Sequence, residues 1–448
     1  MKEARYDCVV CGAGPSGMAA AIALSKEKKK VLLIEETSLL GGTNILSLVG
    51  PLMTFHNQGK QVIGGIASDI VDRLIKSHAS LGHVKDPFAF CSTITPYEVE
   101  SLKALYFDLI SEYNIELLLQ TKVVGAKEEN NRITAIEINN NDGNSLIYAK
   151  CYIDATGDAD LVSYTSNPFV IGRNKDNLCQ PMTMPFIVKG VDFEKIKTAI
   201  KNDPDNFDAD PTYDYSKYVG VSGFFKEVAK GKENGDFNIL RDRVLLFQGV
   251  KNDEAIINTT RITKYSSLDA KQLTLAELEG RKQIKEVADF LKNYIPGFEN
   301  SYILSTPVRL GIRESRHVIG KYIITKEDIM SHARFYDTIA VGAYPMDIHS
   351  PVSDKLEIDD NYTSDLAYEI PLRILISKNI SNLLVTGRAV SATHEAAASL
   401  RVSPIVMALG EATGYMASLA CKYDGELEKV NYQEVQEKIV NNGGIIHY

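Results

Sequence analysis

The chain has 448 residues, of which 44% are hydrophobic and 24% are charged, and it carries a formal net charge of −9. This length predicts two or three domains, or one large fold with an insertion. The negative charge argues against a nucleic acid as the main partner, because phosphate binding needs a basic surface. No run of 18 apolar residues is present, so we expect no membrane span.

The six cysteines show no spacing typical of a disulfide framework, and a reducing, cytoplasmic location is the simplest interpretation. Cys8 and Cys11 form a Cys-x-x-Cys pair inside the first predicted strand, where strand geometry separates them by about 10 Å. We therefore interpret both as small core hydrophobes. We expect no export signal before this strand, and no metal site is predicted from the spacing of His, Cys and Glu.

The first predicted element is a strand that ends in a glycine-rich turn and is followed by a helix. An apolar run at 8–11 leads into Gly12, Gly14 and Gly17, which have GxGxxG spacing. The first glycine permits the turn, the second lets the backbone approach a pyrophosphate, and the third lets the helix pack on the strand. The pattern is typical of dinucleotide binding.

A second predicted strand, 31–34, ends in Glu35, which lies 23 residues after Gly12. This is close to the ~20 residues expected for the acid that binds a ribose hydroxyl. The alternative is an accidental glycine cluster, which the order of strand, helix, strand and acid disfavours. A second glycine turn, Gly41-Gly42-Thr43, follows.

Two predicted helices come next, over residues 63–78 and 96–113, with Thr95 and Pro96 beginning the second. A strand and a β-meander follow, with predicted strands at 115–120, 123–128, 132–138 and 145–148. A returning strand then leads into a third glycine turn, Ala155-Thr156-Gly157. This order predicts an α/β nucleotide-binding domain interrupted by insertions.

The composition changes after about residue 165, and the block to residue 340 has no second glycine fingerprint. Its predicted elements are strands at 183–189 and 244–250, a helix at 273–294, and short strands at 320–324 and 336–341. We interpret this block, 166–340, as an inserted α+β substrate or cap domain over one side of a cofactor.

The last block returns to the glycine-turn pattern. A strand from residue 383 ends in a turn at Gly387-Arg388, and Ser403-Pro404 begins a helix to about residue 421, with Ser403 as the N-cap. Small residues in this helix allow close backbone approach. The predicted organisation is a cofactor domain in two parts, an insertion and a charged peripheral tail, with bounds 1–165, 166–340, 341–422 and 423–448.

Together these motifs resemble the glutathione-reductase-like FAD proteins, specifically the FAD-dependent oxidoreductase family related to the fumarate reductase and succinate dehydrogenase flavoproteins. The resemblance covers residues 6–42, 152–158 and 383–419, and extends to 310–320 and 341–349. It implies an α/β fold: a glutathione-reductase-like, FAD-binding Rossmann domain with a β-meander, interrupted by the inserted domain.

The resemblance implies noncovalent FAD, because no histidine matches a covalent attachment motif. The residues implied to bind it are Gly12, Ala13, Gly14, Pro15, Ser16, Gly17, Glu35, Glu36, Gly41, Gly42, Thr43, Val123, Ala155, Thr156, Gly157, Gly387 and Arg388. The helix from Pro404 would direct its N-terminus at the pyrimidine edge of the flavin, where the reduced ring carries negative charge.

The chain also departs from the proteins that it resembles. Asn44 and Val49 stand where the disulfide reductases have a cysteine pair, so disulfide relay chemistry is not expected. No second GxGxxG is present for NAD(P)H, and the electron donor or acceptor is therefore unknown.

The predicted catalytic residues are Arg313, Arg316, His394 and Arg401. Arginine suits a substrate carboxylate because its planar fork binds both oxygens, although an ion-paired strut between domains is an equal alternative for the arginines near 313. His394 is predicted to exchange a proton near the flavin, with a structural histidine as the alternative. His56 is a weaker candidate, while Asp347 and His349 are expected to fix a turn.

We expect an FAD-dependent oxidoreductase that transfers a hydride between flavin N5 and a small organic substrate, for which a carboxylate-bearing molecule is one option. Two alternatives stay open: a protein with structural or regulatory FAD, and a flavoprotein that modifies tRNA. The acidic net charge disfavours the second.

Overall fold

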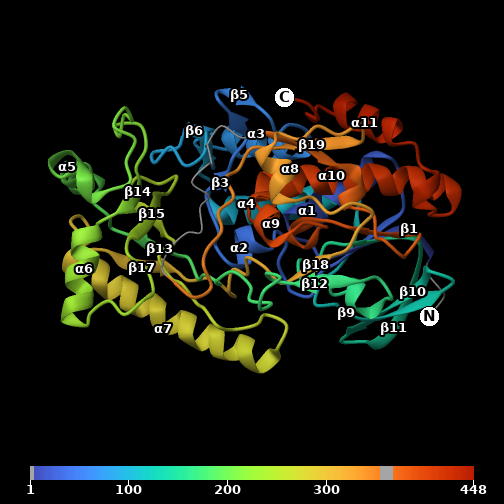
Figure 1. The fold of residues 1–448 in the computed structure, drawn as a ribbon, viewed down its shortest axis with the longest axis horizontal. Coiled ribbons are helices and arrows are strands. Elements are labelled where there is room, and N and C mark those ends of the chain that lie inside the picture. The colour runs from blue at the N-terminus through green and yellow to red at the C-terminus, as the bar shows by residue number, and fades with distance from the viewer. Residues whose placement is uncertain (1–4, 354–366) are drawn as a thin grey trace.

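The computed structural model describes residues 5–353 and 367–448 (Figure 1). Its largest sheet has the strand order β8-β2-β1-β11-β10-β9, with β21 also paired to β11. The strands β1, β2, β8, β11 and β21 run parallel, and their bounds are Arg5–Cys11, Val31–Ile34, Glu116–Leu118, Gly143–Asp154 and Leu383–Val385. This is the Rossmann-like part of the predicted α/β fold.

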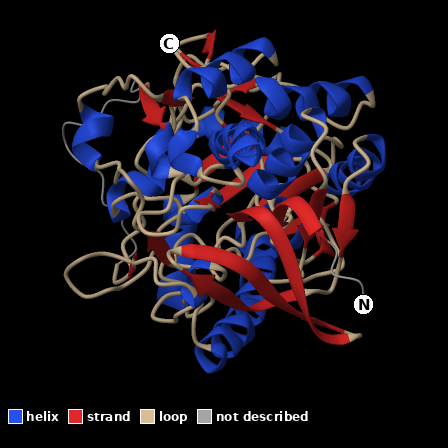
Figure 2. Ribbon diagram, turned by 90° about the vertical axis from the view of Figure 1, so that its right-hand side faces the viewer, coloured by secondary structure: helices blue, strands red, loops and turns tan. Residues whose placement is uncertain are grey.

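The strand β11 joins the parallel part of this sheet to the antiparallel meander. Its later half pairs with β1, while its earlier half pairs with β10 (Arg132–Asn140), which in turn pairs with β9 (Lys122–Glu129). The sequence predicts two separate strands here, but the structure has one. Figure 2, viewed from the side of the meander, shows its long strands across the front of the molecule.

The helices α1 (Pro15–Lys26) and α10 (Ser403–Ala420) pack closely, as the small residues predict. A Cβ on Gly410 would stand 2.1 Å from the backbone oxygen of Ser16, and one on Gly414 would stand 2.5 Å from that of Ala20. Only glycine permits this approach. Cys8 and Cys11 are buried free thiols, as expected: Cys8 packs in the core that contains α1 and α10, and Cys11 packs in a separate core with Val9 and Tyr152.

A second sheet lies at the other end of the molecule, on the left of Figure 1, beside α5, α6 and α7. Its strands are antiparallel, in the order β14-β15-β16-β13-β17. Their bounds are Gly220–Gly223, Val244–Gln248, Glu254–Ile257, Phe186–Lys189 and Tyr302–Ser305, and the helices span Phe193–Asn202, Phe225–Asn234 and Ala270–Tyr294. Large buried side chains, among them Phe186, Phe224 and Phe290, give this region its own hydrophobic core.

Smaller elements complete the fold. The helices are α2 (Thr43–Leu46), α3 (Gly65–Lys76), α4 (Val99–Glu112), α8 (Lys326–Met330), α9 (His394–Leu400) and α11 (Tyr432–Asn441). The strands are β3 (Leu52–Met53), β4 (His56–Asn57), β5 (Lys60–Gln61), β6 (Val84–Lys85), β7 (Thr93–Thr95), β12 (Phe169–Ile171), β18 (Arg316–Val318), β19 (Thr338–Gly342) and β20 (Tyr368–Pro371).

Three predictions about these elements are wrong. Helix α4 begins at Val99 rather than Pro96, because Thr95 pairs with Leu52 in a small sheet and keeps the chain extended. Residues 320–324 make only isolated bridges at their two ends. The tail is not peripheral, since α11 buries Val435 and Ile439 against the main core.

Within the described residues, no helix combines the length and the apolar character that crossing a membrane requires.

Candidate functional site

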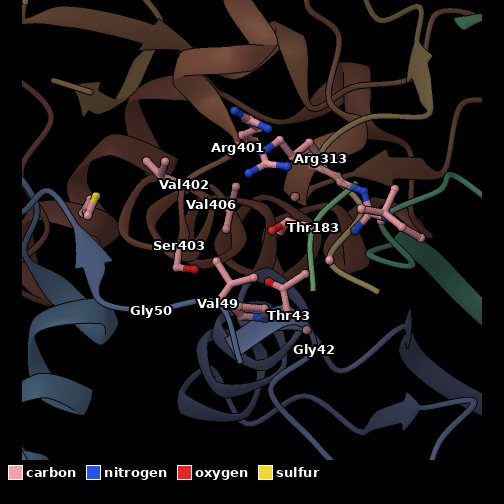
Figure 3. Close-up of a pocket in the computed structure, with 18 of the residues that line it drawn as sticks. Gly42, Thr43, Val49, Gly50, Thr183, Arg313, Arg401, Val402, Ser403 and Val406 are labelled. Atoms are coloured by element: carbon pink, nitrogen blue, oxygen red, sulfur yellow. The ribbon is translucent and has the colours of Figure 1, made fainter. Parts of the chain in front are cut away.

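A cavity of about 880 Å³ extends between the two sheets. One end is lined by the glycine turns that follow the parallel strands, and the other is lined by side chains of the second sheet and by a group of arginines. Figure 3 shows part of this cavity, with Gly42 and Thr43 at one side and Arg313 and Arg401 at the other.

The turn after β1 has the geometry that its glycines predict. Gly12 has φ +98°, and a Cβ on Gly17 would stand 1.9 Å from the backbone oxygen of Gly12. A Cβ on Gly14, in contrast, would meet no protein atom within 4 Å, although Gly14 lines the cavity. Because Gly14 is the N-cap of α1 and offers no capping side chain, the first N–H groups of this helix are available for an anionic ligand.

Glu35 lies at the carboxyl end of β2 and lines the same end of the cavity. Its Oε2 accepts a hydrogen bond from the Ala13 N–H at 2.8 Å, and its Oε1 accepts bonds from the Thr37 N–H at 3.0 Å and the Thr37 hydroxyl at 2.8 Å. The backbone therefore fixes a buried carboxylate beside the glycine turn, where a ribose hydroxyl could donate to it.

Most residues predicted to bind the cofactor line the cavity. They are Gly12, Gly14, Pro15, Ser16, Glu35, Glu36, Gly42, Thr43, Val123, Ala155, Thr156, Gly157, Gly387 and Arg388. Ala13, Gly17 and Gly41 lie behind this lining and support it: the Gly41 N–H, for example, donates to the Ala13 oxygen at 2.8 Å. Arg388 is held by Asp158 at 2.8 Å.

The N-terminus of α10 reaches the cavity through Val402, Ser403 and Val406. The prediction that Ser403 is the N-cap is wrong, because Val402 occupies that position and Ser403 is already helical. The Ser403 hydroxyl instead donates to the amide oxygen of Asn44 at 3.0 Å. No N-cap side chain covers this helix end, so its N–H dipoles point toward whatever occupies the cavity.

Arg313 and Arg401 extend into the same part of the cavity (Figure 3). One Nη of Arg401 donates to the backbone oxygen and to the carboxylate of Asp347, at 2.9 and 3.1 Å. Arg313 donates to the Pro181 oxygen at 2.7 Å. Burial, together with repulsion from Arg401, lowers the pKa of Arg313 to about 9. The region is therefore strongly favourable for an anion.

Asp347 and His349, which were expected to fix a turn, also line the cavity. His349 Nε2 lies 3.1 Å from Asp347 Oδ2, and its Nδ1 lies 3.2 Å from an Nη of Arg261. Because a guanidinium can only donate, Nδ1 accepts and Nε2 carries the proton. Burial lowers the pKa of His349 to about 3, so the ring is neutral and both nitrogens are engaged.

His394 and Arg316 do not line the cavity. The buried Glu314 binds His394 Nδ1 at 2.7 Å and His317 Nε2 at 2.8 Å through one oxygen, and accepts from the Gln180 N–H at 2.8 Å through the other. Arg316 donates to the Asp158 oxygen at 2.7 Å and pairs with Asp160 at 3.2 Å. The geometry favours the structural alternatives for both residues.

Arg241 and Arg261, which the sequence did not predict as site residues, line the cavity from the second sheet. Arg261 lies shortly after β16, and its Nη2 donates to the backbone oxygens of Ser350 and Ser353 at 2.7 and 2.9 Å. Neither arginine belongs to a motif. The short run Arg241-Asp242-Arg243 in an otherwise apolar stretch was the available signal.

His56 stays outside the cavity and bonds Thr93 at 3.2 Å. Residues 5–353 and 367–448 contain no group of three or more His, Cys, Asp or Glu side chains arranged to hold a metal ion.

Comparisons with known proteins agree with this geometry. The model of a family described as FAD dependent oxidoreductase matches residues 7–439. A segment of 63 residues is 41% identical to the soluble pyridine nucleotide transhydrogenase of Hahella chejuensis (strain KCTC 2396), but it covers only 14% of this chain and 14% of that protein.

Among solved structures, the flavin-dependent brominase Bmp2 aligns over 98% of this chain and 83% of its own, with 12% identity and a TM-score of 0.50. A geranylgeranyl bacteriochlorophyll reductase-like protein from Thermoplasma acidophilum aligns over the same shares of the two chains, with 11% identity and a TM-score of 0.47. At such identities the similarity concerns the fold alone.

Proposed function

The chain belongs to the FAD-dependent oxidoreductase family, and from that premise we propose that it transfers a hydride between FAD and a small organic acid whose carboxylate Arg313 and Arg401 bind. It is an FAD-dependent enzyme. When bound, FAD supplies a flavin N5 that accepts or donates the hydride. The chain's own residues must hold the cofactor, orient the acid and keep water away.

The cavity lining supports a position for each part of FAD. The first turn of α1, at Gly14, would hold the diphosphate through backbone N–H groups. Glu35 would accept from the adenosine ribose, and Val123 would offer its backbone to adenine. The N-terminus of α10, at Ser403, would stabilise negative charge on the pyrimidine edge of the flavin.

The observation that carries the proposal is the pair Arg313 and Arg401 on the cavity wall beside that helix end. A planar guanidinium binds a carboxylate through two parallel N–H bonds, which fixes the orientation of the acid as well as its position. Asp347 already engages one Nη of Arg401, so it holds the guanidinium in place for the ligand.

The second sheet supports the proposed role of residues 166–340 as a cover for the substrate. Ser222, Leu245, Phe247 and Asn258 line the cavity from β14, from β15 and from the end of β16. Phe88 and Phe247 both line the cavity, with ring centroids 5.5 Å apart, and together they give it apolar surface. Exclusion of water strengthens the charge interactions of the arginines.

The proposal is tested by the spectrum of the purified protein and by its reaction with organic acids. We expect bound FAD, and we expect one class of carboxylic acids either to bleach the oxidised flavin or to reoxidise the photoreduced flavin in the absence of oxygen. Arg313→Met and Arg401→Met should abolish this reaction and retain FAD, while Arg73→Met, at a surface ion pair with Glu112, should be unchanged. If no acid exchanges electrons with the flavin, the proposal is rejected.

A further inference from the structure

Arg241 is a buried cation whose guanidinium makes no hydrogen bond or ion pair with the residues that the structure describes. The residue precedes β15, is 7% exposed, and lines the cavity. Its Nε is fully buried without a partner. A buried charge without a partner destabilises the fold, so such a group indicates a missing ligand.

The neighbouring carboxylates Asp242 and Asp347 attract Arg241, but neither forms an ion pair with it, because each is engaged by other groups. Asp242 accepts from Arg243 at 2.8 and 3.0 Å, and Asp208 also pairs with Arg243. Asp347 is engaged by Arg401 and His349. Burial and the repulsion from Arg261 and Arg243 lower the pKa of Arg241 to about 10, and the side chain therefore still carries its charge at neutral pH.

The charges of the cavity wall add to a surplus. At this end the lining has five arginines and three aspartates, which leaves an excess of two positive charges; they are Arg241, Arg243, Arg261, Arg313, Arg401, Asp208, Asp242 and Asp347. A substrate with one carboxylate would neutralise only half of this excess. Arg241 also comes from a different segment than Arg313, so the two guanidiniums approach the cavity from separate elements.

We propose that the substrate carries two anionic groups, the carboxylate bound by Arg313 and Arg401 and a second anion bound by Arg241. The inference rests on the proposed function for the first carboxylate. Leu245 and Phe247, on the same wall as Arg241, suit a hydrocarbon skeleton between the two anions. The second anion is a carboxylate or a phosphate, because a guanidinium binds both.

The test uses the FAD-loaded protein and measures Kd from the change in flavin absorbance. The probes are linear dicarboxylates of about four to eight carbons, the monocarboxylates of the same length, and phosphonocarboxylates, which carry a phosphonate at one end. The variants are Arg241→Met and Arg241→Lys, with Arg73→Met as the control. FAD content and thermal midpoint report whether each variant is folded.

In the wild type, we expect the best dicarboxylate or phosphonocarboxylate to bind at least tenfold more tightly than its monocarboxylate, which corresponds to about 1.4 kcal/mol. Arg241→Met should reduce this ratio to about one without weakening the monocarboxylate, and Arg241→Lys should retain part of it. A wild-type ratio near one overturns the inference, as does a ratio unchanged in Arg241→Met. If no acid of any series binds, the proposed function itself fails. The wild-type ratio decides the matter if Arg241→Met does not fold.

Discussion

Arg401 donates from a single Nη to both the backbone oxygen and the carboxylate of Asp347, at 2.9 and 3.1 Å. Asp347 therefore fixes the direction of this guanidinium before any ligand arrives. His349 donates to the same carboxylate oxygen, at 3.1 Å, and so limits its movement.

Asp347→Asn should weaken catalysis without loss of FAD. Arg401 and His349 would lose charge-assisted hydrogen bonds, each worth roughly 1.5–3 kcal/mol, and Arg401 would no longer be held toward the substrate. We expect kcat/KM to fall roughly ten- to hundredfold with flavin content unchanged. Asp210→Asn, which removes the charge of a carboxylate that pairs with the exposed Lys85 and does not line the cavity, is the matched control. Equal kcat/KM in Asp347→Asn and wild type would show that the orientation of Arg401 is irrelevant.

Gly14→Ala and Gly410→Ala should separate cofactor binding from folding. The added methyl at Gly14 meets no protein atom within 4 Å and extends into the cavity, so the variant should fold and lose affinity for FAD at least tenfold. The added methyl at Gly410 would lie 2.1 Å from the Ser16 oxygen, so α1 and α10 must separate and the thermal midpoint should fall. Both quantities are measured on the FAD-free and the loaded protein. Identical behaviour of the two variants would contradict this division.

The sequence predicts the cofactor end of the cavity far better than the substrate end. Gly12, Gly14 and Glu35 follow a local pattern in which spacing along the chain determines position in space. Arg241 and Arg261, in contrast, reach the cavity only because the second sheet folds against the first, and this is a long-range contact without a motif. Arg313 and Arg401 were predicted from the resemblance, but nothing local distinguishes them from Arg316, which points to Asp158 and Asp160 instead.

Because long-range contacts leave no local motif, the sequence also did not predict the burial of the C-terminal helix or the partner of His394. Val435 and Ile439 lie in a charged segment, and their burial depends on a surface that α10 provides. His394 follows a glycine turn and suggests a catalytic group, yet the buried Glu314, 80 residues away in sequence, binds it.

His394→Asn should therefore reduce stability rather than turnover. The shorter side chain cannot keep the bond to Glu314 Oε1, and a buried carboxylate that loses a partner costs roughly 1–3 kcal/mol. We expect a lower free energy of unfolding in urea, with Kd for the acids and FAD content close to wild type. His56→Asn, at a half-buried bond to Thr93, is the control. A loss of turnover with unchanged stability would restore a catalytic role for His394.

Glu411 should make the stability of the protein depend on pH. This carboxylate is buried in the middle of α10, where its Oε2 accepts from the Ile66 N–H at 2.9 Å and thereby caps α3, and where it also interacts with the Tyr415 side chain. Burial raises the pKa of Glu411 from 4.5 to about 7. The folded chain therefore binds this proton more tightly than the unfolded chain does, and the stabilisation is complete below pH 4.5 and lost as the pH rises through 7. The difference corresponds to about 3 kcal/mol.

Glu411→Gln removes this dependence, because the amide keeps an acceptor for Ile66 and is neutral at every pH. At pH 8 the variant should unfold at a higher temperature than the wild type, whereas at pH 5 the two should be nearly equal. Glu100→Gln, whose carboxylate is 78% exposed, should show no such difference between the two pH values. Thermal unfolding of all three proteins at pH 5 and pH 8 is the measurement. If Glu411→Gln and the wild type are equally stable at pH 8, the ionised Glu411 does not destabilise the folded protein. Another group must then account for any loss of stability above pH 7.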